Sequence, residues 1–335
     1  MMRAAVIEKP GVITVMDVAI PEPGPKEVLI RIAASGICGT DIHIFNGDYL
    51  GTYPIIPGHE FSGIVASAGS EVTRVKPGDR VAVEPNISCG ICDACLGNRQ
   101  NFCRDRKALG VDLPGGMAEF TAVPESAVFP IGDLSFRAGA FAEPLSCVIH
   151  GAEQIGLRLG DRILIIGAGP VGILLAQVMR MMGASEITQA DRNEFRLDFA
   201  KQLNGSVACA LLEDLPEDFF DAVADATGSP RVMERTVTLV REGGSILLFG
   251  VPPKEASLSL PAFTLFRKGI TLKATYTSVR NSVQAVRLLG SKAVTVEPLV
   301  SHELPLEEIA HGFALVSGGL EQVMKVHVLP GSTRG

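Results

Sequence analysis

The sequence predicts an α/β protein of two domains, a β-rich domain followed by a doubly wound parallel sheet. Three observations support this fold class. The chain has 335 residues, which is more than one hydrophobic core usually holds. Proline and glycine interrupt the first part of the chain heavily. From about residue 150, short apolar runs alternate with segments of helical length, which is typical of parallel strands covered by helices on both faces.

The first domain, residues 1–150, reads as short strands joined by long loops. The strand candidates are KEVLIRIAASGI and GDRVAVEP, and turns are indicated by PEPGPKE, IIPGHE, VKPGDR and LPGG. This spacing predicts a β-barrel or a β-sandwich.

The second domain, residues 151–293, begins with the apolar run DRILIIG and the helical segment PVGILLAQVMRMMG. The strand EITQAD and the amphipathic helix RNEFRLDFAKQLNG follow. Two further strands, FFDAVADATG and GGSILLFG, flank the helix SPRVMERTVTLVRE, and ITLKAT and VRNSVQAVRLLG extend the alternation. From about Val294 the chain returns to mixed strand and helix character, so we expect a separate C-terminal segment over residues 294–335.

Composition and charge narrow the function classes. The net charge of −7 argues against nucleic-acid and anionic-membrane partners, which bind basic surfaces. The uncharged run from Ile163 to Met179 contains the turn GAGP, so a strand-turn-helix unit explains it better than a membrane span. The N-terminal stretch has no secretory signal, and the odd number of cysteines, seven, argues against a disulfide scaffold. We therefore expect a cytoplasmic protein.

A dinucleotide site is predicted by the motif GAGPVG, which follows a strand and opens a helix. Gly167 permits the tight turn, Gly169 lets the backbone approach a pyrophosphate, and Gly172 allows close packing of helix on strand. Pro170 and Val171 complete the motif at the helix N-terminus, which faces the anion.

Four other positions bear on the cofactor. Asp191 ends the next strand, where a carboxylate binds the ribose hydroxyls of NAD and repels the 2′-phosphate of NADP. Arg192 beside it weakens this preference, because a guanidinium there can hold that phosphate. Thr227 and Val251 lie in loops at strand ends, where ligands meet a doubly wound sheet, and are further candidates for cofactor contact.

A catalytic zinc site is predicted from residues spread over the first domain. Cys38, His59 and Glu60 lie in glycine-flanked loops, and Glu143 lies just before the dinucleotide-binding domain, where an interdomain cleft is expected. Thiolate, imidazole and carboxylate form the zinc ligand set, and three protein ligands with one open position define a catalytic site. Glu60 and Glu143 compete for the third position, and the sequence leaves that choice open.

A second metal site is predicted from four cysteines within sixteen residues. Cys89, Cys92, Cys95 and Cys103 follow the spacing C-x2-C-x2-C-x7-C. Four thiolates complete the tetrahedron of zinc and leave no position for substrate, so the site is expected to be structural. An iron–sulfur cluster and an empty, redox-sensitive loop are the alternatives.

The motifs together resemble a known family, the zinc-dependent medium-chain alcohol dehydrogenases. CGTDIH is similar to the family's catalytic cysteine motif, and PGHEFSG is similar to its histidine–glutamate motif. GDRV and GGMAEF match connecting loops, and GAGPVG matches the cofactor turn, so the resemblance runs in order through nearly the whole chain. The resemblance implies a GroES-like β-barrel catalytic domain, to which residues 294–335 return, and a Rossmann domain. It also implies two zinc ions per chain, one catalytic and one structural.

The resemblance extends to the substrate class. EPLSCVIHG is similar to the polyol branch, the sorbitol and sugar-alcohol dehydrogenases, whereas CGTDIHIFNG is close to the threonine dehydrogenase version of the first motif. The expected function is oxidation of a secondary alcohol of a polyol to a ketose with NAD. L-threonine, another amino alcohol and a phosphorylated polyol are alternative substrates.

Two other kinds of protein are also considered, a non-catalytic zinc-ribbon binding protein and a zinc-free quinone reductase. We also expect a homo-oligomer, a dimer or a tetramer.

The expected mechanism assigns further residues. Zinc acts as a Lewis acid on the substrate hydroxyl, as it does when it lowers the pKa of bound water from about 15.7 to about 7, and hydride passes to the nicotinamide. Thr40 resembles the family's relay hydroxyl, and His43 is expected to carry the proton onward. The candidates for substrate selection are four aromatic residues, Phe45, Tyr49, Phe266 and Tyr276.

Overall fold

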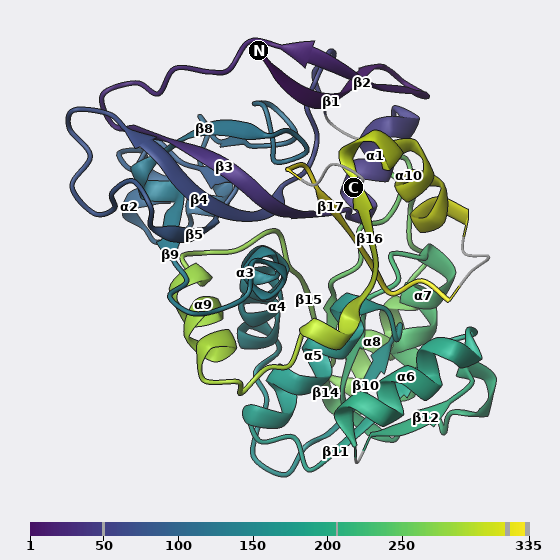
Figure 1. The fold of residues 1–335 in the computed structure, drawn as a ribbon. Helices are drawn as coiled ribbons and strands as arrows, with labels where there is room; N and C mark the ends of the chain where they lie inside the picture. Colours follow the sequence, from purple (N-terminus) through teal and green to yellow (C-terminus); the bar gives the residue numbers. More distant parts are fainter. Residues whose placement is uncertain (49–50, 206, 319–321, 332–335) are drawn as a thin grey trace. The chain divides into compact units, whose positions relative to one another are not determined.

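The computed structural model describes residues 1–48, 51–205, 207–318 and 322–331 (Figure 1). The chain divides into two compact units. Unit 1 comprises residues 1–146 and 279–335, and unit 2 comprises residues 147–278. Within the described ranges, no helix is both long enough and apolar enough to cross a bilayer.

Unit 1 is built on a sheet that takes strands from both ends of the chain. Its strands are β3 (Glu27–Gly36), β4 (Glu60–Ala68), β5 (Arg80–Val83), β8 (Phe120–Pro124), β9 (Val128–Pro130), β16 (Val300–Pro305) and β17 (Lys325–Leu329). The order is β16-β17-β3-β4-β5-β9, and β8 pairs with β3. Gly36 at the end of β3 lies opposite Glu60 on one side and His327 on the other. The register therefore brings the start of β4 and the start of β17 to the same end of β3.

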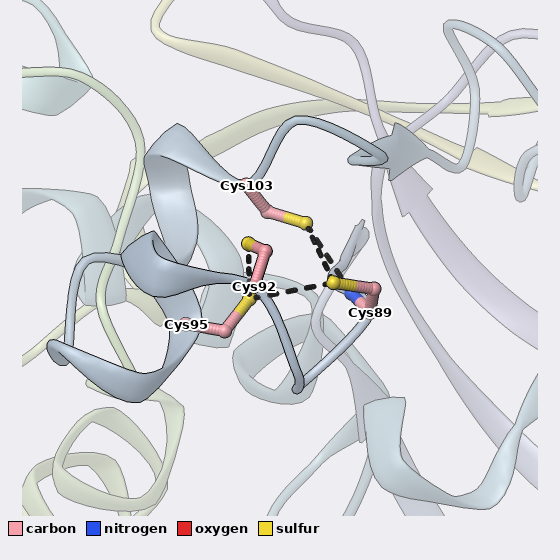
Figure 2. A group of neighbouring side chains, drawn as sticks. All are labelled: Cys89, Cys92, Cys95 and Cys103. Atoms are coloured by element: carbon pink, nitrogen blue, oxygen red, sulfur yellow. Dashed lines mark hydrogen bonds between the residues drawn. The ribbon is translucent and has the colours of Figure 1, made fainter.

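The remaining elements of unit 1 surround this sheet. A hairpin, β1 (Met2–Lys9) and β2 (Val12–Val18), opens the chain (Figure 1). The helices are α1 (Gly39–Asn46), α2 (Asp93–Leu96), α3 (Phe136–Ala140), α4 (Ala142–Ile155), α9 (Ser282–Gly290) and α10 (Ile309–Gly318), of which α4 runs on into unit 2. The four cysteines lie on a lobe, residues 88–103, that contains α2 and the short helix Gln100–Phe102 (Figure 2). The two-stranded ladder β6 (Asn86–Ile87) with β7 (Lys107–Ala108) flanks this lobe.

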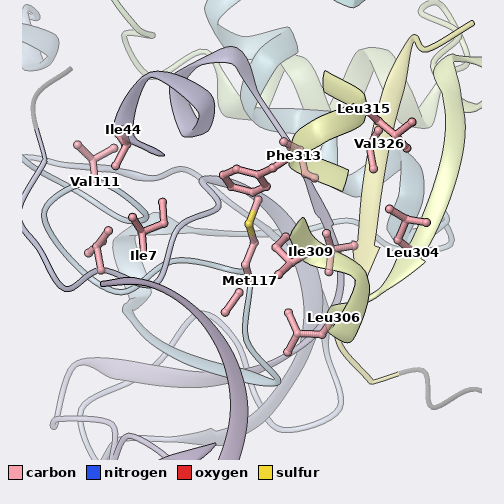
Figure 3. Close-up of a cluster of buried hydrophobic side chains, with 14 of the residues drawn as sticks. Ile7, Ile44, Val111, Met117, Leu304, Leu306, Ile309, Phe313, Leu315 and Val326 are labelled. Carbon is pink, nitrogen blue, oxygen red and sulfur yellow. The ribbon is translucent and has the colours of Figure 1, made fainter. Parts of the chain in front are cut away.

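A buried apolar cluster fixes the C-terminal segment on unit 1 (Figure 3). Ile7 from β1 and Ile44 from α1 pack in the same cluster as Phe313 from α10 and Val326 from β17. Removing this apolar surface from water favours the return of the chain after unit 2. The segment is thus held by a shared core as well as by the pairing of β17 with β3.

Unit 2 is a six-stranded, wholly parallel sheet. Its strands are β10 (Arg162–Ile166), β11 (Glu186–Ala190), β12 (Ala208–Ala210), β13 (Phe220–Asp225), β14 (Val240–Leu248) and β15 (Thr271–Ala274). The helices are α5 (Pro170–Met181), α6 (Glu194–Asn204), α7 (Pro230–Leu239) and α8 (Ala262–Lys268). The order β12-β11-β10-β13-β14-β15 reverses direction between β10 and β13, which is the switch point where Rossmann sheets bind dinucleotides. The predicted α/β fold class is confirmed.

The division into units differs from the predicted domain boundaries at the C-terminal side. The second domain was predicted to reach residue 293, whereas unit 2 ends at Ser278, and α9 belongs to unit 1. The physical reason is long-range contact within unit 1, because Ser282 Oγ at the start of α9 donates to Glu84 Oε2 at 2.6 Å and α9 contacts β9. Helical periodicity predicted this helix and carried no information about the sheet on which it packs.

Candidate functional site

The structure brings Cys38, His59 and Glu60 together. One ligand atom from each lies within 4.8 Å of the others, and His59 and Glu60 are buried. Cys38 is the N-cap of α1 and His59 lies in the loop before β4, as predicted, whereas Glu60 is the first residue of β4 and not a loop residue. Because Glu60 lies in a β-strand, its side chain extends from a rigid element. A strand positions a side chain more precisely than a loop does.

Asp41, which the sequence analysis did not single out, orients this group. Its carboxylate is fully buried and accepts hydrogen bonds from the backbone N–H of Cys38 at 2.9 Å and of Gly58 at 3.0 Å. Its Oδ1 also lies 3.5 Å from His59 Nδ1. Burial lowers the pKa of His59, but Asp41 and Cys38 outweigh it and raise that pKa well above its usual range. A carboxylate behind a metal-binding histidine fixes the ring orientation.

Lys325 forms an ion pair with Glu60 in the same region. The side chains of Lys325 and Glu60 are 6% and 2% exposed. Burial lowers the pKa of Lys325, but Glu60 and then Cys38 raise it, so the ammonium stays charged. A Cβ on Gly36 would lie 2.5 Å from Glu60 Oε2 and 2.8 Å from Lys325 Cε, so only glycine leaves room for the pair. Neither Lys325 nor Gly36 carries a motif that identifies it in the sequence.

The other predicted catalytic residues lie outside this group. Glu143 is in the first turn of α4 and is buried, and the described metal-binding group does not include it. Its backbone carbonyl accepts from Ser146 Oγ at 2.7 Å. Thr40 lies half-buried in the first turn of α1. His43, in the last turn of α1, places Nδ1 3.0 Å from Asp48 Oδ1.

The cysteine lobe fits a structural zinc ion. All seven cysteines are free, and Figure 2 shows the four sulfurs turned toward one another. The Sγ distances are 3.5 Å for Cys92–Cys95 and for Cys89–Cys103, and 4.0 Å for Cys89–Cys95. Four sulfurs at about 2.3 Å from a tetrahedral zinc lie roughly 3.8 Å apart, which matches this spacing. A hydrogen bond from the backbone of Cys95 is the main cause that lowers the pKa of Cys92 to about 6, whereas burial raises the pKa of Cys95 to about 11. Cys92 is therefore the thiol of this pair that forms the metal-binding thiolate more readily.

The dinucleotide motif borders a cavity of about 1160 Å³ in unit 2. The predicted residues that line it are Gly167, Gly169, Pro170, Val171, Gly172, Asp191, Arg192 and Thr227. Gly167 has φ +111°, and a Cβ on Gly172 would lie 1.8 Å from the carbonyl oxygen of Gly167, so both positions require glycine. Val251 is not among the lining residues.

Two charged side chains of this cavity lie beside the glycine turn. Asp191 Oδ2 accepts from the backbone N–H of Ala168 at 2.8 Å, and Oδ1 accepts from that of Asn193 at 2.9 Å, so the carboxylate is fixed beside the glycine turn. Arg196, in α6, also lines the cavity. Its Nε is buried and has no hydrogen-bond partner among the described residues, and Nη1 lies 3.8 Å from the position of a Cβ on Gly169. The sequence analysis missed Arg196, although it follows the acidic strand end by five positions.

The aromatic candidates for substrate selection do not form one group. The Phe45 ring packs edge-on against Phe313 at 5.5 Å, so it belongs to the core of unit 1. Phe266 is 81% exposed on α8 of unit 2. Tyr276 lies in unit 2 as well, and Tyr49 lies outside the described residues. These positions give no support to a shared aromatic pocket.

Comparison with known proteins settles the family. Residues 24–133 match the family model of the alcohol dehydrogenase GroES-like domain, and residues 170–291 match that of the zinc-binding dehydrogenases. The chain is 39% identical over 315 residues to a D-altritol 5-dehydrogenase of Agrobacterium fabrum, covering 92% of this chain and 94% of that protein. The chain belongs to the zinc-dependent medium-chain alcohol dehydrogenases. The expected family and fold are therefore confirmed.

Two further comparisons give a relative with another named activity and a similar solved structure. An L-threonine 3-dehydrogenase of Bacillus velezensis is 33% identical and covers 95% of each chain. The crystal structure of a zinc-binding dehydrogenase from Sinorhizobium meliloti, bound to NADP, superposes with a TM-score of 0.94 at 31% identity, covering 98% of this chain and 99% of that one. Membership of a dehydrogenase family makes the protein an enzyme and excludes the zinc-ribbon binding protein as an alternative.

Proposed function

We propose that this dehydrogenase oxidises a secondary alcohol of a polyol to a ketose with NAD as hydride acceptor. The observation that carries the proposal is the grouping of half-buried Cys38 with buried His59 and Glu60 in a chain of this family. The D-altritol 5-dehydrogenase relative supports a polyol as the substrate.

The three grouped side chains would hold the catalytic zinc. A thiolate, an imidazole and a carboxylate fit its ligand preference, and zinc in such a site acts as a Lewis acid toward a hydroxyl. Asp41 keeps Cys38 and His59 in place through the contacts described above. Because Lys325 holds Glu60, Glu143 remains the competing third ligand. Glu60→Gln and Glu143→Gln decide between them, since the variant that lacks the true ligand loses catalytic zinc in a metal measurement.

The cavity of unit 2 would hold NAD. The fixed carboxylate of Asp191 favours ribose hydroxyls over a 2′-phosphate, while exposed Arg192 and the NADP-bound relative favour the phosphate. Because the carboxylate cannot turn away without losing two hydrogen bonds, NAD is the proposed cofactor. A kcat/KM for NADP at or above that for NAD would contradict this choice.

Thr40 and His43 are proposed to move the released proton. Thr40 lies in the first turn of the helix that Cys38 caps, and His43 lies three residues later with Asp48 beside its ring. The Asp48 carboxylate would orient the imidazole ring of His43 for this role.

The substrate test is a panel of pentitols, hexitols and L-threonine, each incubated with NAD while NADH is followed by absorbance. The proposal expects the highest kcat/KM for a polyol. The L-threonine 3-dehydrogenase relative and the motif CGTDIHIFNG support the second candidate, so a clear preference for threonine would replace the polyol. A phosphorylated polyol forms the third arm of the panel.

A cytoplasmic homo-oligomer, a dimer or a tetramer, completes the proposal. Seven free cysteines suit a reducing compartment, and the net charge of −7 suits a protein without nucleic-acid partners. Light scattering of the purified chain measures the oligomeric state.

A further inference from the structure

Asp225 is a fully buried carboxylate at the carboxyl end of β13. In the described parts of the chain, no ion pair reaches it, and its hydrogen bonds come from the turn that follows. Oδ1 accepts from the backbone N–H of Thr227 at 3.1 Å and from Thr227 Oγ1 at 2.6 Å, and Oδ2 accepts from the backbone N–H of Gly228 at 3.1 Å. One side chain therefore sets the conformation of the whole turn, residues 226–229.

This turn forms one wall of the dinucleotide cavity. Ala226, Thr227 and Ser229 line the cavity, as does the glycine turn after β10. Thr227 Oγ1 donates to Asp225 and accepts from the backbone N–H of Ser229 at 3.1 Å, so its hydroxyl is occupied within the turn. The shape of the wall thus depends on Asp225, and the contribution of Thr227 to the cofactor comes through the position of its backbone and methyl group.

The turn is also bonded to its neighbours and packed against them. The backbone N–H of Ala226 donates to the carbonyl of Ile166 at 2.8 Å, and a Cβ on Gly228 would lie 2.3 Å from the carbonyl oxygen of Val251. The carbonyl of Asp225 accepts from Phe249 and Gly250, both at 2.9 Å. Interiors packed this closely transmit a displacement instead of absorbing it. A shift of the 226–229 turn would therefore move the glycine turn beside it.

The stability of the fold alone does not explain a carboxylate at position 225. Burial raises the pKa of Asp225, while the hydrogen bonds from Thr227 and Gly228 lower it. A buried charge without an opposite charge is costly, and apolar residues of similar volume are often as stable or more stable. Asparagine has nearly the same shape but offers one acceptor oxygen and one NH₂ donor. The NH₂ group of an asparagine at this position would face either the N–H of Gly228 or the donors of Thr227. Two donors would then face each other without an acceptor between them.

We propose that Asp225 is a positioning residue for the dinucleotide, holding the 226–229 turn against the glycine turn 167–172 so that the cavity wall is formed before the cofactor arrives. The inference rests on the proposed use of this cavity for NAD. It assigns Asp225 no contact with the cofactor and no part in hydride transfer.

The test compares Asp225→Asn with Asp221→Asn, a matched control on the same strand. Asp221 lies at the other end of β13 and binds Arg162 and Arg241, away from the cavity lining. The full chain of each variant is titrated with NADH by fluorescence, and its melting temperature and its KM for NAD and kcat are measured. We expect Asp225→Asn to raise the Kd for NADH about tenfold or more and to raise KM more than it lowers kcat. Asp221→Asn should lower the melting temperature and leave the Kd for NADH within about twofold.

Equal NADH affinity in Asp225→Asn and the unchanged protein would overturn the inference. If Asp225→Asn does not fold, Thr227→Val replaces it, because valine removes the two hydroxyl bonds and leaves the carboxylate in place. A raised Kd for NADH in that variant supports the inference, and an unchanged one overturns it. Failure of the unchanged protein to bind NADH or NADPH would instead overturn the proposed function, and this inference with it.

Discussion

Glu60 and Lys325 form an ion pair that lies almost entirely out of contact with solvent, although one residue opens β4 and the other opens β17. Breaking such a pair by removing one partner leaves an uncompensated buried charge. We expect Lys325→Met to lower the free energy of unfolding by about 3–5 kcal/mol. Urea denaturation at pH 7 measures the change.

The double variant Lys325→Met with Glu60→Gln removes both charges and should recover part of this loss. Lys26→Met is the matched control, because the Lys26–Glu71 pair lies on the surface, where such pairs contribute about 1 kcal/mol or less. A loss in Lys325→Met no larger than that in Lys26→Met would contradict the importance of the buried pair.

Metal content should separate the two predicted zinc sites. We expect about two zinc ions per chain in the unchanged protein and about one in Cys38→Ser, with the melting temperature nearly kept and the alcohol oxidation lost. Cys92→Ser should also retain about one ion but melt at a lower temperature, because four thiolates close the lobe. Inductively coupled plasma mass spectrometry with thermal melting provides both readouts. Two ions in Cys38→Ser would contradict the catalytic assignment.

His327 should make the fold sensitive to acid. The ring is fully buried, and within the described structure neither nitrogen has a hydrogen-bond partner. Burial, with the charges of Lys325 and Arg137, lowers the pKa of His327 to about 3. The unfolded chain binds this proton near pH 6.5 and the folded chain does not, so stability falls as the pH decreases from about 6.5 toward 3, by up to about 1.4 kcal/mol per pH unit.

The variant His327→Leu should therefore be at least as stable as the unchanged protein at pH 7, since it removes two unpartnered polar atoms. It should also lose less stability between pH 7 and pH 5. The exposed His311 is the control, and His311→Gln should keep the original pH dependence. Identical slopes of unfolding free energy against pH for His327→Leu and the unchanged protein would show that His327 is not the cause of the acid sensitivity.

Arg196 is expected to bind the anionic part of the cofactor. A guanidinium beside the glycine turn attracts a pyrophosphate, and its buried Nε has no other partner in the described chain. We expect Arg196→Ala to raise the Kd for NADH about tenfold, with a weaker dependence on salt than the unchanged protein shows. Arg267→Ala, on exposed α8, should alter neither quantity. NADH titration at two salt concentrations makes the comparison.

Local patterns in the sequence predicted much of the fold and of the site. Gly167 and Gly172 could be assigned because the steric reasons for glycine lie within one turn, and Cys38 and His59 lie in short motifs with metal-binding side chains. The helix α9 was predicted as a helix, and its predicted place in the second domain differs from the division into units, because periodicity does not specify the packing partner.

The missed residues depend on distant parts of the chain. Lys325 acquires its role only through the pairing of β17 with β3, and Gly36 only through the two side chains that pass over it. Asp225 resembles any aspartate at a strand end until its burial is known. Asp41 is the exception, because it lies within CGTDIH, three residues after its N-cap partner, where an acidic residue at the third helical position indicates a capping box.

The discontinuous path of unit 1 has a consequence for biosynthesis. Unit 2 is contiguous, whereas unit 1 takes strands from both sides of it. Chains leave the ribosome at about 5–20 residues per second, so Cys38, His59 and Glu60 emerge many seconds before Lys325. A nascent chain that has reached Ser278 carries the thiol, the imidazole and the carboxylate but not the ammonium that neutralises the carboxylate. Zinc captured during translation would meet a carboxylate free of Lys325, whereas zinc captured after release would compete with a counter-ion already in place.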